Sequence, residues 1–233
     1  MISARNINLR IAGKPIFDGG SIDIDRQQIT GIIGPNGAGK TTFFDLLCSV
    51  RRPDSGTLKV ACEARSYLSQ TLGMPANLTM REIHGLLAVL SSKRSISTDD
   101  TLTKLKRWDP YLAGKYAETL KKRPSHCSYG EIRFFFTLSL LSLPNKLIIL
   151  DEPTAGVDPE SRHYIWQVLH KARDEGATIV VSSHNIHEIT EHCDVFHLIH
   201  KRRFLKFAGA REFLDHFAEA TLDEAFIRSA RGH

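Results

Sequence analysis

The chain has 233 residues, of which 42% are hydrophobic and 24% are charged, and its formal net charge is +5. This length suits one large domain or a domain with a sizeable insertion, and no apolar run approaches the roughly 18 residues that a membrane-spanning helix needs, which excludes an integral membrane protein. Residues 1–10 lack the apolar centre of a signal peptide, and the four cysteines form no Cys-x-x-Cys pair. We therefore expect a cytoplasmic protein with reduced thiols.

The chain is predicted to begin with β-strands and to continue into a glycine-rich loop and a helix. Residues 1–30 alternate apolar and polar side chains, as in NINLRIA and SIDID, which favours antiparallel strands. Residues 30–34, TGIIG, form a short β-rich run that meets the loop, and residues 40–50 have the pattern of a helix.

The middle of the chain is predicted to be a helical insertion. Residues 75–143 show helical periodicity in LTMREIHGLLAVL and again in EIRFFFTLSLL, with a polar stretch rich in Ser, Lys and Asp between them. We expect this insertion to interrupt a core formed by residues 1–74 and 144–233.

The C-terminal part is predicted to alternate strands with helices. The predicted strands are 147–150, 177–182 and 195–199, the predicted helices are 159–173 and 186–192, and RFLKFAG then closes a hairpin. This alternation is typical of an α/β fold with a mostly parallel sheet that helices cover on both faces.

The glycine-rich loop fits a phosphate-binding pattern. Residues 34–41, GPNGAGKT, match G-x-x-x-x-G-K-[ST] without a mismatch, between a predicted strand and a predicted helix. Backbone N–H groups of such a loop surround a phosphate, and the helix presents its positive end. We expect Lys40 to reach the β- and γ-phosphates of a nucleotide and Thr41 to bind Mg²⁺. The residues predicted to contact the nucleotide here are Gly34, Pro35, Asn36, Gly37, Ala38, Gly39, Lys40, Thr41 and Thr42.

Two carboxylates, Asp151 and Glu152, follow the apolar run LIIL. Ligands of parallel-sheet folds bind at the carboxyl ends of the strands. An Asp-Glu pair is elsewhere usually a surface turn, but the phosphate loop in the same chain favours a functional pair. We expect Asp151 to support Mg²⁺ and Glu152 to activate or orient the attacking water as general base.

With these motifs in place, the sequence resembles the ATPase subunits of ATP-binding-cassette (ABC) transporters over residues 2–228. GPNGAGKTT is the family's usual phosphate-loop sequence, and LIILDEPTAGVDP resembles its second Walker motif running into the D-loop. Gln70 falls where the family keeps a glutamine that senses Mg²⁺ and water, Asp158 at its D-loop aspartate, and His184 at its switch histidine. The resemblance implies ATP and Mg²⁺ as ligands, with Gln70 and His184 catalytic beside Glu152.

The same resemblance implies a fold and an assembly. The fold is a P-loop NTPase core with an N-terminal antiparallel β subdomain and an inserted helical signature subdomain. Such domains work as head-to-tail pairs that hold each ATP between one phosphate loop and the partner's signature motif, so we expect a homodimer. The signature motif, commonly LSGGQ, reads CSYGE here, with Ser128 and Gly130 predicted to contact the partner's nucleotide and Tyr129 in place of a glycine.

The position where the family commonly stacks an aromatic side chain on adenine falls near Ile11, and Phe17 is the alternative. We therefore expect looser discrimination between nucleotides. A zinc-protease pattern fails at His187-Glu188, because no histidine follows at the required spacing.

Three functions remain in competition at this stage. The C-terminal TLDEAFIRSARG resembles the ending of ATPases that pair with ABC-2-type membrane subunits, which favours an exporter motor on the cytoplasmic face of the membrane, bound to an integral membrane permease. A soluble ABC ATPase acting on ribosomes or nucleic acid is the alternative, but it would need long coiled-coil insertions or a second cassette. The basic residues 93–123 are interpreted as a solvated helical face, so no nucleic-acid partner is expected. A regulator without hydrolysis conflicts with the intact Lys40, Asp151 and Glu152.

Overall fold

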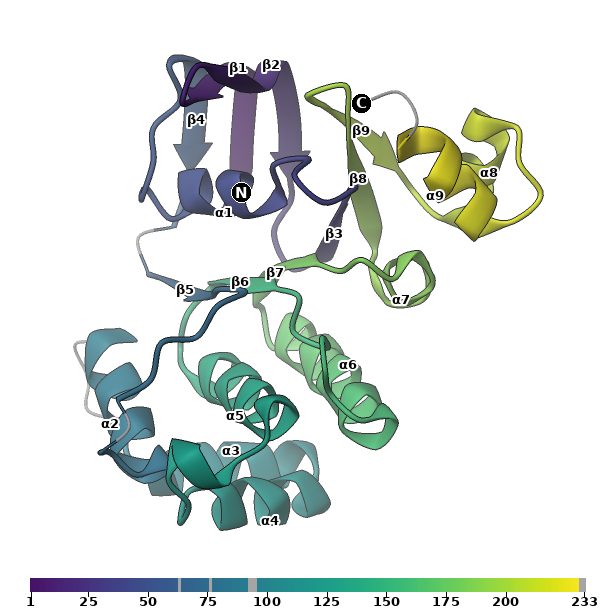
Figure 1. Cartoon of the computed structure of the whole chain (residues 1–233). Helices are drawn as coiled ribbons and strands as arrows, with labels where there is room; N and C mark the ends of the chain where they lie inside the picture. The colour runs from purple at the N-terminus through teal and green to yellow at the C-terminus, as the bar shows by residue number, and fades with distance from the viewer. Residues whose placement is uncertain (63, 76, 92–95, 231–233) are drawn as a thin grey trace. The chain divides into compact units, whose positions relative to one another are not determined.

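The computed structural model describes residues 1–62, 64–75, 77–91 and 96–230 (Figure 1). The chain divides into two compact units, one formed by residues 1–63 and 178–233 and the other by residues 64–177. Among the described residues, no helix combines the length and the apolar character that a membrane span requires.

The first unit contains two groups of strands. In the first group β1 (Ile2–Ile11) pairs antiparallel with β2 (Lys14–Ile24) and β4 (Ser55–Val60), as the alternating sequence predicts. In the second group β3 (Ile29–Ile33) pairs in parallel with β7 (Thr178–Ser182) and β8 (Val195–His200), and β8 forms the predicted hairpin with β9 (Arg203–Phe207). All residues of β3 and β7 are buried, which explains why both strands are mostly apolar.

Helices and an aromatic core complete this unit. The helices are α1 (Lys40–Leu47), α7 (Ile186–His192), α8 (Ala210–Phe217) and α9 (Leu222–Ala230). Helix α1 is shorter than the predicted helix over residues 40–50, because the chain turns at Ser49, whose φ is +60°. Phe17, Phe43 and Phe204 pack their rings together, with the Phe17 and Phe204 rings stacked at 5.3 Å.

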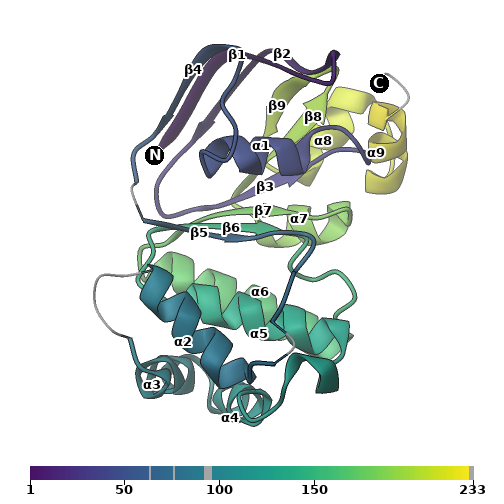
Figure 2. The same ribbon diagram turned by 60° about the vertical axis from the view of Figure 1, so that its left-hand side comes forward.

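In the second unit, helices pack around one buried helix. Strands β5 (Arg65–Leu68) and β6 (Leu147–Asp151) pair in parallel, and α5 (Tyr129–Ser142) lies against them with α6 (Pro159–Asp174) beside it (Figures 1 and 2). Helices α2 (Met80–Ser91), α3 (Thr98–Trp108) and α4 (Pro110–Thr119) pack on the rest of α5. Every residue of α5 from Ile132 to Ser142 is buried. The unit therefore depends on α5 as its central element.

A hydrogen-bonded network inside this helical core replaces part of the apolar packing. His84 lies between two hydroxyl groups, with Nε2 3.1 Å from Thr101 Oγ1 and Nδ1 2.9 Å from Tyr116 Oη. The Tyr116 Oη atom also lies 2.6 Å from Ser139 Oγ, so the network joins α2, α3, α4 and α5. Buried polar groups must find such partners, because an unpaired one costs about 1–3 kcal/mol. The network thereby specifies how these helices pack.

Two buried histidines predict a loss of stability in acid. Burial lowers the pKa of His84, and it lowers the pKa of His197 to about 4, with Lys206 adding to the shift and Asp23 opposing it. The unfolded side chains titrate near 6.5. Below that pH the unfolded chain binds protons that the folded chain does not, so the free energy of unfolding should fall as the pH drops from ~6.5 to ~4.

Urea unfolding at a series of pH values measures this loss, of which His197 should contribute up to about 3 kcal/mol. His197→Leu should flatten the acid side of the profile, whereas the exposed His163→Gln should leave it unchanged. An identical acid slope in His197→Leu and the parent would contradict the prediction.

Candidate functional site

The predicted phosphate loop links β3 to α1 and is organised by its own lysine. The Lys40 ammonium donates to the carbonyls of Gly34, at 2.8 Å, and Pro35, at 3.4 Å. Gly39, the residue before α1, has φ +107°, and a Cβ there would lie 2.8 Å from Ile16 Cγ2. Only glycine therefore fits at this point. As the N-cap residue, Gly39 has no side chain to cap the first turn of α1, and the N–H groups at the start of a helix suit an anionic ligand.

Strand register brings His184 to the same sheet edge as this loop. In the parallel pair of β3 and β7, Ile32 lies opposite Ser182. Gly34 and His184 each follow two residues later, so both lie beyond the carboxyl ends of adjacent strands. His184 is exposed in the turn before α7, where Asn185 caps the helix through His187 N at 3.0 Å. The structure thus brings together the predicted phosphate loop and the predicted switch histidine.

The expected position for a base-stacking side chain holds no free aromatic ring. Ile11 is half-buried at the end of β1. Phe17 is only 1% exposed, and its ring is stacked on Phe204 and packed edge-on against Phe43. The alternative assignment of Phe17 to base stacking was therefore wrong, because its ring is buried in the aromatic core of this unit.

A second sheet edge carries the predicted carboxylates. In the parallel pair of β5 and β6, Leu68 lies opposite Leu150. Gln70 and Glu152 follow two residues later on the two strands, and Asp151 ends β6. Asp151 is 1% exposed and Glu152 is 6% exposed. Glu152 has φ +55°, a left-handed conformation that costs a non-glycine residue about 1 kcal/mol or more, so surrounding contacts must hold it there.

The signature segment begins α5 with a capping box. Ser128 Oγ accepts from Glu131 N at 3.1 Å, and the Glu131 carboxylate accepts from Ser128 N at 2.8 Å. Lys122 donates to the same carboxylate at 2.7 Å, and these bonds hold the pKa of Glu131 below its usual value. In this structure the Ser128 hydroxyl caps its own helix.

Gly130 and Tyr129 both contact the turn that follows Glu152. A Cβ at Gly130 would lie 2.6 Å from the Gly156 carbonyl oxygen, so this position accepts no side chain. A Cβ at Gly156 would in turn lie 2.9 Å from Tyr129 Cδ1. The Tyr129 ring therefore covers Gly156, and its hydroxyl lies 3.4 Å from the Gln70 carbonyl oxygen. The side chain that replaces a glycine in the motif is directed into its own unit.

Sequence reasoning missed Arg133, which connects several of these segments. Its guanidinium is fully buried and donates to backbone carbonyls after both β5 and β6 and to the Tyr129 hydroxyl. The available signal was a single charged residue inside the apolar run EIRFFFTLSLL. A buried charge is costly unless it is fully hydrogen-bonded, so its position there needs an explanation.

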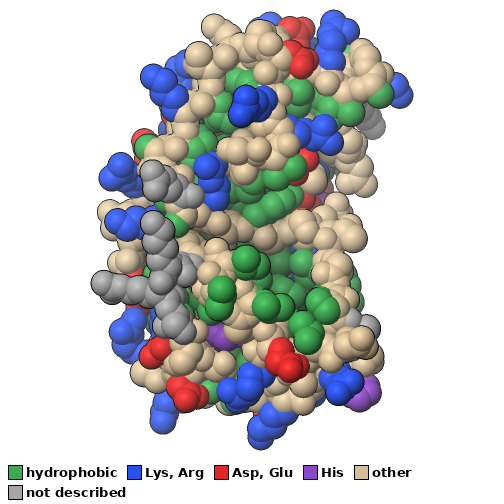
Figure 3. Space-filling model, turned by 90° about the vertical axis from the view of Figure 1, so that its left-hand side faces the viewer, with side chains coloured by type: hydrophobic (Ala, Val, Ile, Leu, Met, Phe, Trp, Pro, Cys, Tyr) green, Lys and Arg blue, Asp and Glu red, His purple; other side chains and the backbone are tan. Residues whose placement is uncertain are grey.

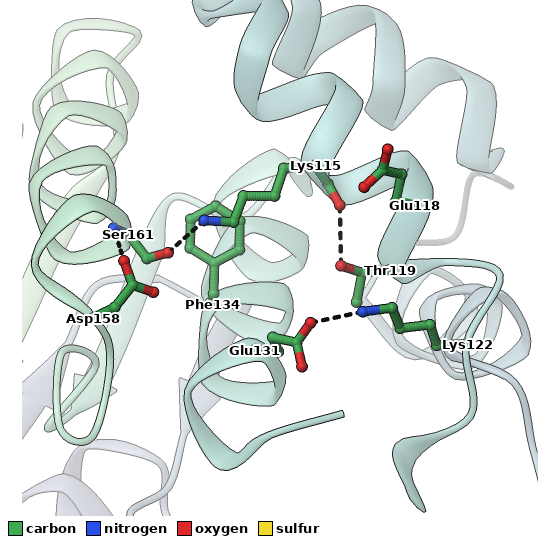
Figure 4. A pocket seen from close by; sticks show the side chains of 8 residues that line it. All are labelled: Lys115, Glu118, Thr119, Lys122, Glu131, Phe134, Asp158 and Ser161. Carbon is green, nitrogen blue, oxygen red and sulfur yellow. Dashed lines mark hydrogen bonds and ion pairs between the residues drawn. The ribbon is translucent and has the colours of Figure 1, made fainter. Parts of the chain in front are cut away.

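Asp158 is the N-cap of α6. Its carboxylate accepts from Ser161 N at 2.9 Å, and hydrogen bonds from Ser161 hold its pKa below the usual value. Asp158 also lines a small cavity of about 120 Å³ between α4, α5 and α6 (Figure 4). Both lysines that line the cavity already donate to other lining residues, Lys115 to Ser161 and Lys122 to Glu131. We therefore assign the cavity no ligand.

The residues present suit a nucleotide with a divalent cation. Hydroxyl, amide and carboxylate oxygens, from Thr41, Gln70 and Asp151, are the hard donors that Mg²⁺ prefers. Among the described residues, no group of three or more His, Cys, Asp and Glu side chains could hold a metal ion without other ligands.

Comparison with known proteins identifies the family. Residues 17–155 match the ABC transporter family. The chain is 26% identical to Protein McbF of Escherichia coli over 94% of this chain and 90% of that protein. It is 28% identical to Nod factor export ATP-binding protein I of Ralstonia nicotianae, over 93% of this chain and 69% of that protein.

Solved structures show the same fold. The ATP-binding subunit of an ABC transporter matches with a TM-score of 0.82 at 23% identity, over 97% of this chain and 98% of that one. A dimeric post-hydrolysis ATP-binding cassette with bound ADP and Pi matches with a TM-score of 0.75 at 16% identity, over 89% of this chain and 98% of that one. The predicted α/β cassette fold is confirmed, and the chain belongs to the ABC transporter ATP-binding proteins, the subunits that bind and hydrolyse ATP.

Proposed function

We propose that this chain is the motor subunit of an ABC-2-type exporter, acting as a homodimer with a separate membrane permease. The observation that carries the proposal is that polar residues of the family's motifs lie at the carboxyl ends of two pairs of parallel strands. One edge carries the phosphate loop and His184, and the other carries Gln70, Asp151 and Glu152. A relative named for Nod factor export supports the exporter class.

Each residue has a proposed role from its place in the family's motifs. Residues 34–42 bind the triphosphate, with Lys40 neutralising its charge, and Mg²⁺ is assigned to Thr41, Gln70 and Asp151. Bound Mg²⁺ would neutralise charge that develops on the phosphate oxygens. Glu152 orients the attacking water and accepts its proton, and His184 contacts the γ-phosphate.

The assembly follows from the signature segment. Ser128, Gly130 and Asp158 lie in the second unit, on segments remote in sequence from the phosphate loop. We assign them to the nucleotide of a partner chain, so that two copies form two composite sites. The inserted helical subdomain, residues 75–143 in this proposal, then presents the signature motif to the partner.

An apolar patch on α2 supports a membrane subunit as the further partner. Leu86, Val89 and Leu90 are 50%, 68% and 84% exposed, and their spacing places them on one side of the helix. Figure 3 shows hydrophobic side chains gathered on this face of the second unit. Contiguous exposed apolar surface marks an interaction site. We infer that a cytoplasmic segment of the permease docks there, which would hold this subunit at the cytoplasmic face of the membrane.

The basic segment 93–123 gives less support to a nucleic-acid partner. Arg107 pairs with Glu175 at 2.6 Å, and Lys122 pairs with Glu131 at 2.7 Å. Lys104 donates to the carbonyls of Leu141 and Ser142. These cations stabilise their own unit, whereas a nucleic-acid surface presents its cations to phosphates.

Lys40→Ala should weaken ATP binding by ~10-fold or more while leaving the fold intact, because it removes the cation of the phosphate loop. Isothermal titration calorimetry measures the affinity, and circular dichroism checks the fold. Lys59→Ala, on an exposed strand of the same unit, is the matched control and should bind ATP as the parent does. Equal affinity in Lys40→Ala and the parent would remove the loop from the nucleotide site.

Glu152→Gln should bind ATP but reduce turnover by ~10²-fold or more, the contribution expected of a positioned base. Phosphate release measures turnover beside the ATP dissociation constant. Asp174→Asn, an exposed acid at the end of α6, is the control and should turn over normally. If Glu152→Gln kept the parent's rate, another group would have to activate the water.

Glu152→Gln should also reveal the assembly. Without nucleotide it should be mainly monomeric, and with ATP and Mg²⁺ it should form a dimer, since bound triphosphate stabilises whichever state it contacts more fully. Light scattering measures the mass in both conditions, with Lys40→Ala as a control that should stay monomeric. A chain that remains monomeric with ATP demonstrably bound, even beside its permease, would overturn the paired-site mechanism.

A further inference from the structure

Arg133 makes an unusual set of contacts for a buried cation. Its side chain is fully buried at the start of the buried stretch of α5. The acceptors of its N–H groups are four backbone carbonyls and one hydroxyl. Nε donates to Glu152 O at 2.8 Å, and Nη2 donates to Asp151 O. Nη1 donates to Gln70 O at 2.9 Å, to Tyr129 Oη at 3.1 Å and to Ser69 O at 3.3 Å. One guanidinium thus holds the backbone beyond two adjacent strands.

Three of these carbonyls belong to residues of the proposed site, Gln70, Asp151 and Glu152. Gln70 and Glu152 occupy matching positions beyond β5 and β6, and Arg133 bridges them. The bond to Glu152 O acts on a residue in the left-handed region, at φ +55°. Strained conformations persist only where the surroundings enforce them. The guanidinium is therefore part of what holds the Glu152 backbone in this conformation.

The same guanidinium contacts the signature segment. Its Cζ lies 5.7 Å from the centre of the Tyr129 ring, and the Tyr129 hydroxyl completes its set of acceptors. Tyr129 immediately follows the cap of α5 and covers Gly156. A displacement of Tyr129 would thus change the contacts of Arg133, and with them the support of Glu152.

We propose that Arg133 is a positioning residue for ATP hydrolysis, which holds the backbone of Gln70, Asp151 and Glu152 and links it through Tyr129 to the signature segment of the same chain. The inference rests on the proposed function, since it presumes the assigned role of Glu152. Arg133 does not touch the nucleotide in this scheme. It acts through the residues whose backbone it binds.

The planar fork of arginine is essential to this role. Arginine presents five N–H donors in fixed directions, whereas lysine offers a compact charge on a flexible stem. Arg133→Lys keeps the charge but cannot reach carbonyls of both strands at once. Misplacement of a catalytic group by about 1 Å can cost ~10²-fold in rate. We expect Arg133→Lys to lower kcat by ~10-fold or more, with the ATP dissociation constant within ~2-fold of the parent.

The experiment compares steady-state turnover, ATP affinity and Tm for the parent, Arg133→Lys and Arg133→Gln. Lys104→Met is the matched control, because Lys104 also donates to buried-helix carbonyls, of Leu141 and Ser142, and lies over the Trp108 ring. It should lower Tm yet leave kcat within ~2-fold at a temperature well below Tm. If the Arg133 variants also lowered Tm and left kcat within ~2-fold of the parent, Arg133 would have only a structural role, and the proposal would be overturned.

Tyr129→Leu tests the link and covers the case in which both Arg133 variants fail to fold. Tyr129 is 50% exposed, so its replacement should be tolerated. Loss of the ring and hydroxyl should lower kcat by ~3-fold or more without a matching change in ATP affinity, and unchanged kcat would refute the link. A parent chain that binds ATP but never hydrolyses it, alone or beside its permease, would instead overturn the proposed function and this inference with it.

Discussion

Parallel pairing of buried strands decides where the polar residues of this cassette lie. The pairs Ile32–Ser182 and Leu68–Leu150 set two registers, and each places a residue of the proposed site two positions after each paired residue. Strands β3, β6 and β7 are buried throughout, so a slip of one residue would exchange the side chains on their two covered faces. The hydrophobic core thus fixes the positions of these polar residues indirectly, through the register of the strands.

Register alone does not hold the loops that follow the strands, and a cation does so in each unit. Lys40 binds carbonyls of its own loop from a half-buried position on a flexible stem. In the proposed function it would exchange those carbonyls for phosphate oxygens when a nucleotide binds. Arg133 is fully buried, and its acceptors surround a rigid fork. Lys40 is thus suited to change its hydrogen-bond partners during the proposed cycle of ATP binding and hydrolysis, whereas Arg133 is suited to keep the same partners.

The sequence predicted the strand-loop-helix motifs well, because each depends on local chemistry: glycines before α1, apolar runs for β6 and β7, and carboxylates directly after a strand. Helices α3 and α4 were described only as a polar stretch, although Ser97 and Asp100 form a capping box and Asp109-Pro110 marks a second start. Phe17 and Arg133 could not be placed, because their environments come from Phe204 and from β5, far away in the chain. Non-local contacts of this kind leave no periodic signal.

Contacts of the signature segment within its own unit explain how it differs from LSGGQ. Its first glycine position holds Tyr129, whose side chain turns into its own unit, over Gly156 and against Arg133. The position that tolerates no Cβ is Gly130, where the Gly156 carbonyl would lie 2.6 Å away, and that glycine is kept. Glutamate in place of glutamine completes the capping box of α5 and pairs with Lys122. The ring and hydroxyl of Tyr129 thus give Arg133 a partner that glycine could not supply.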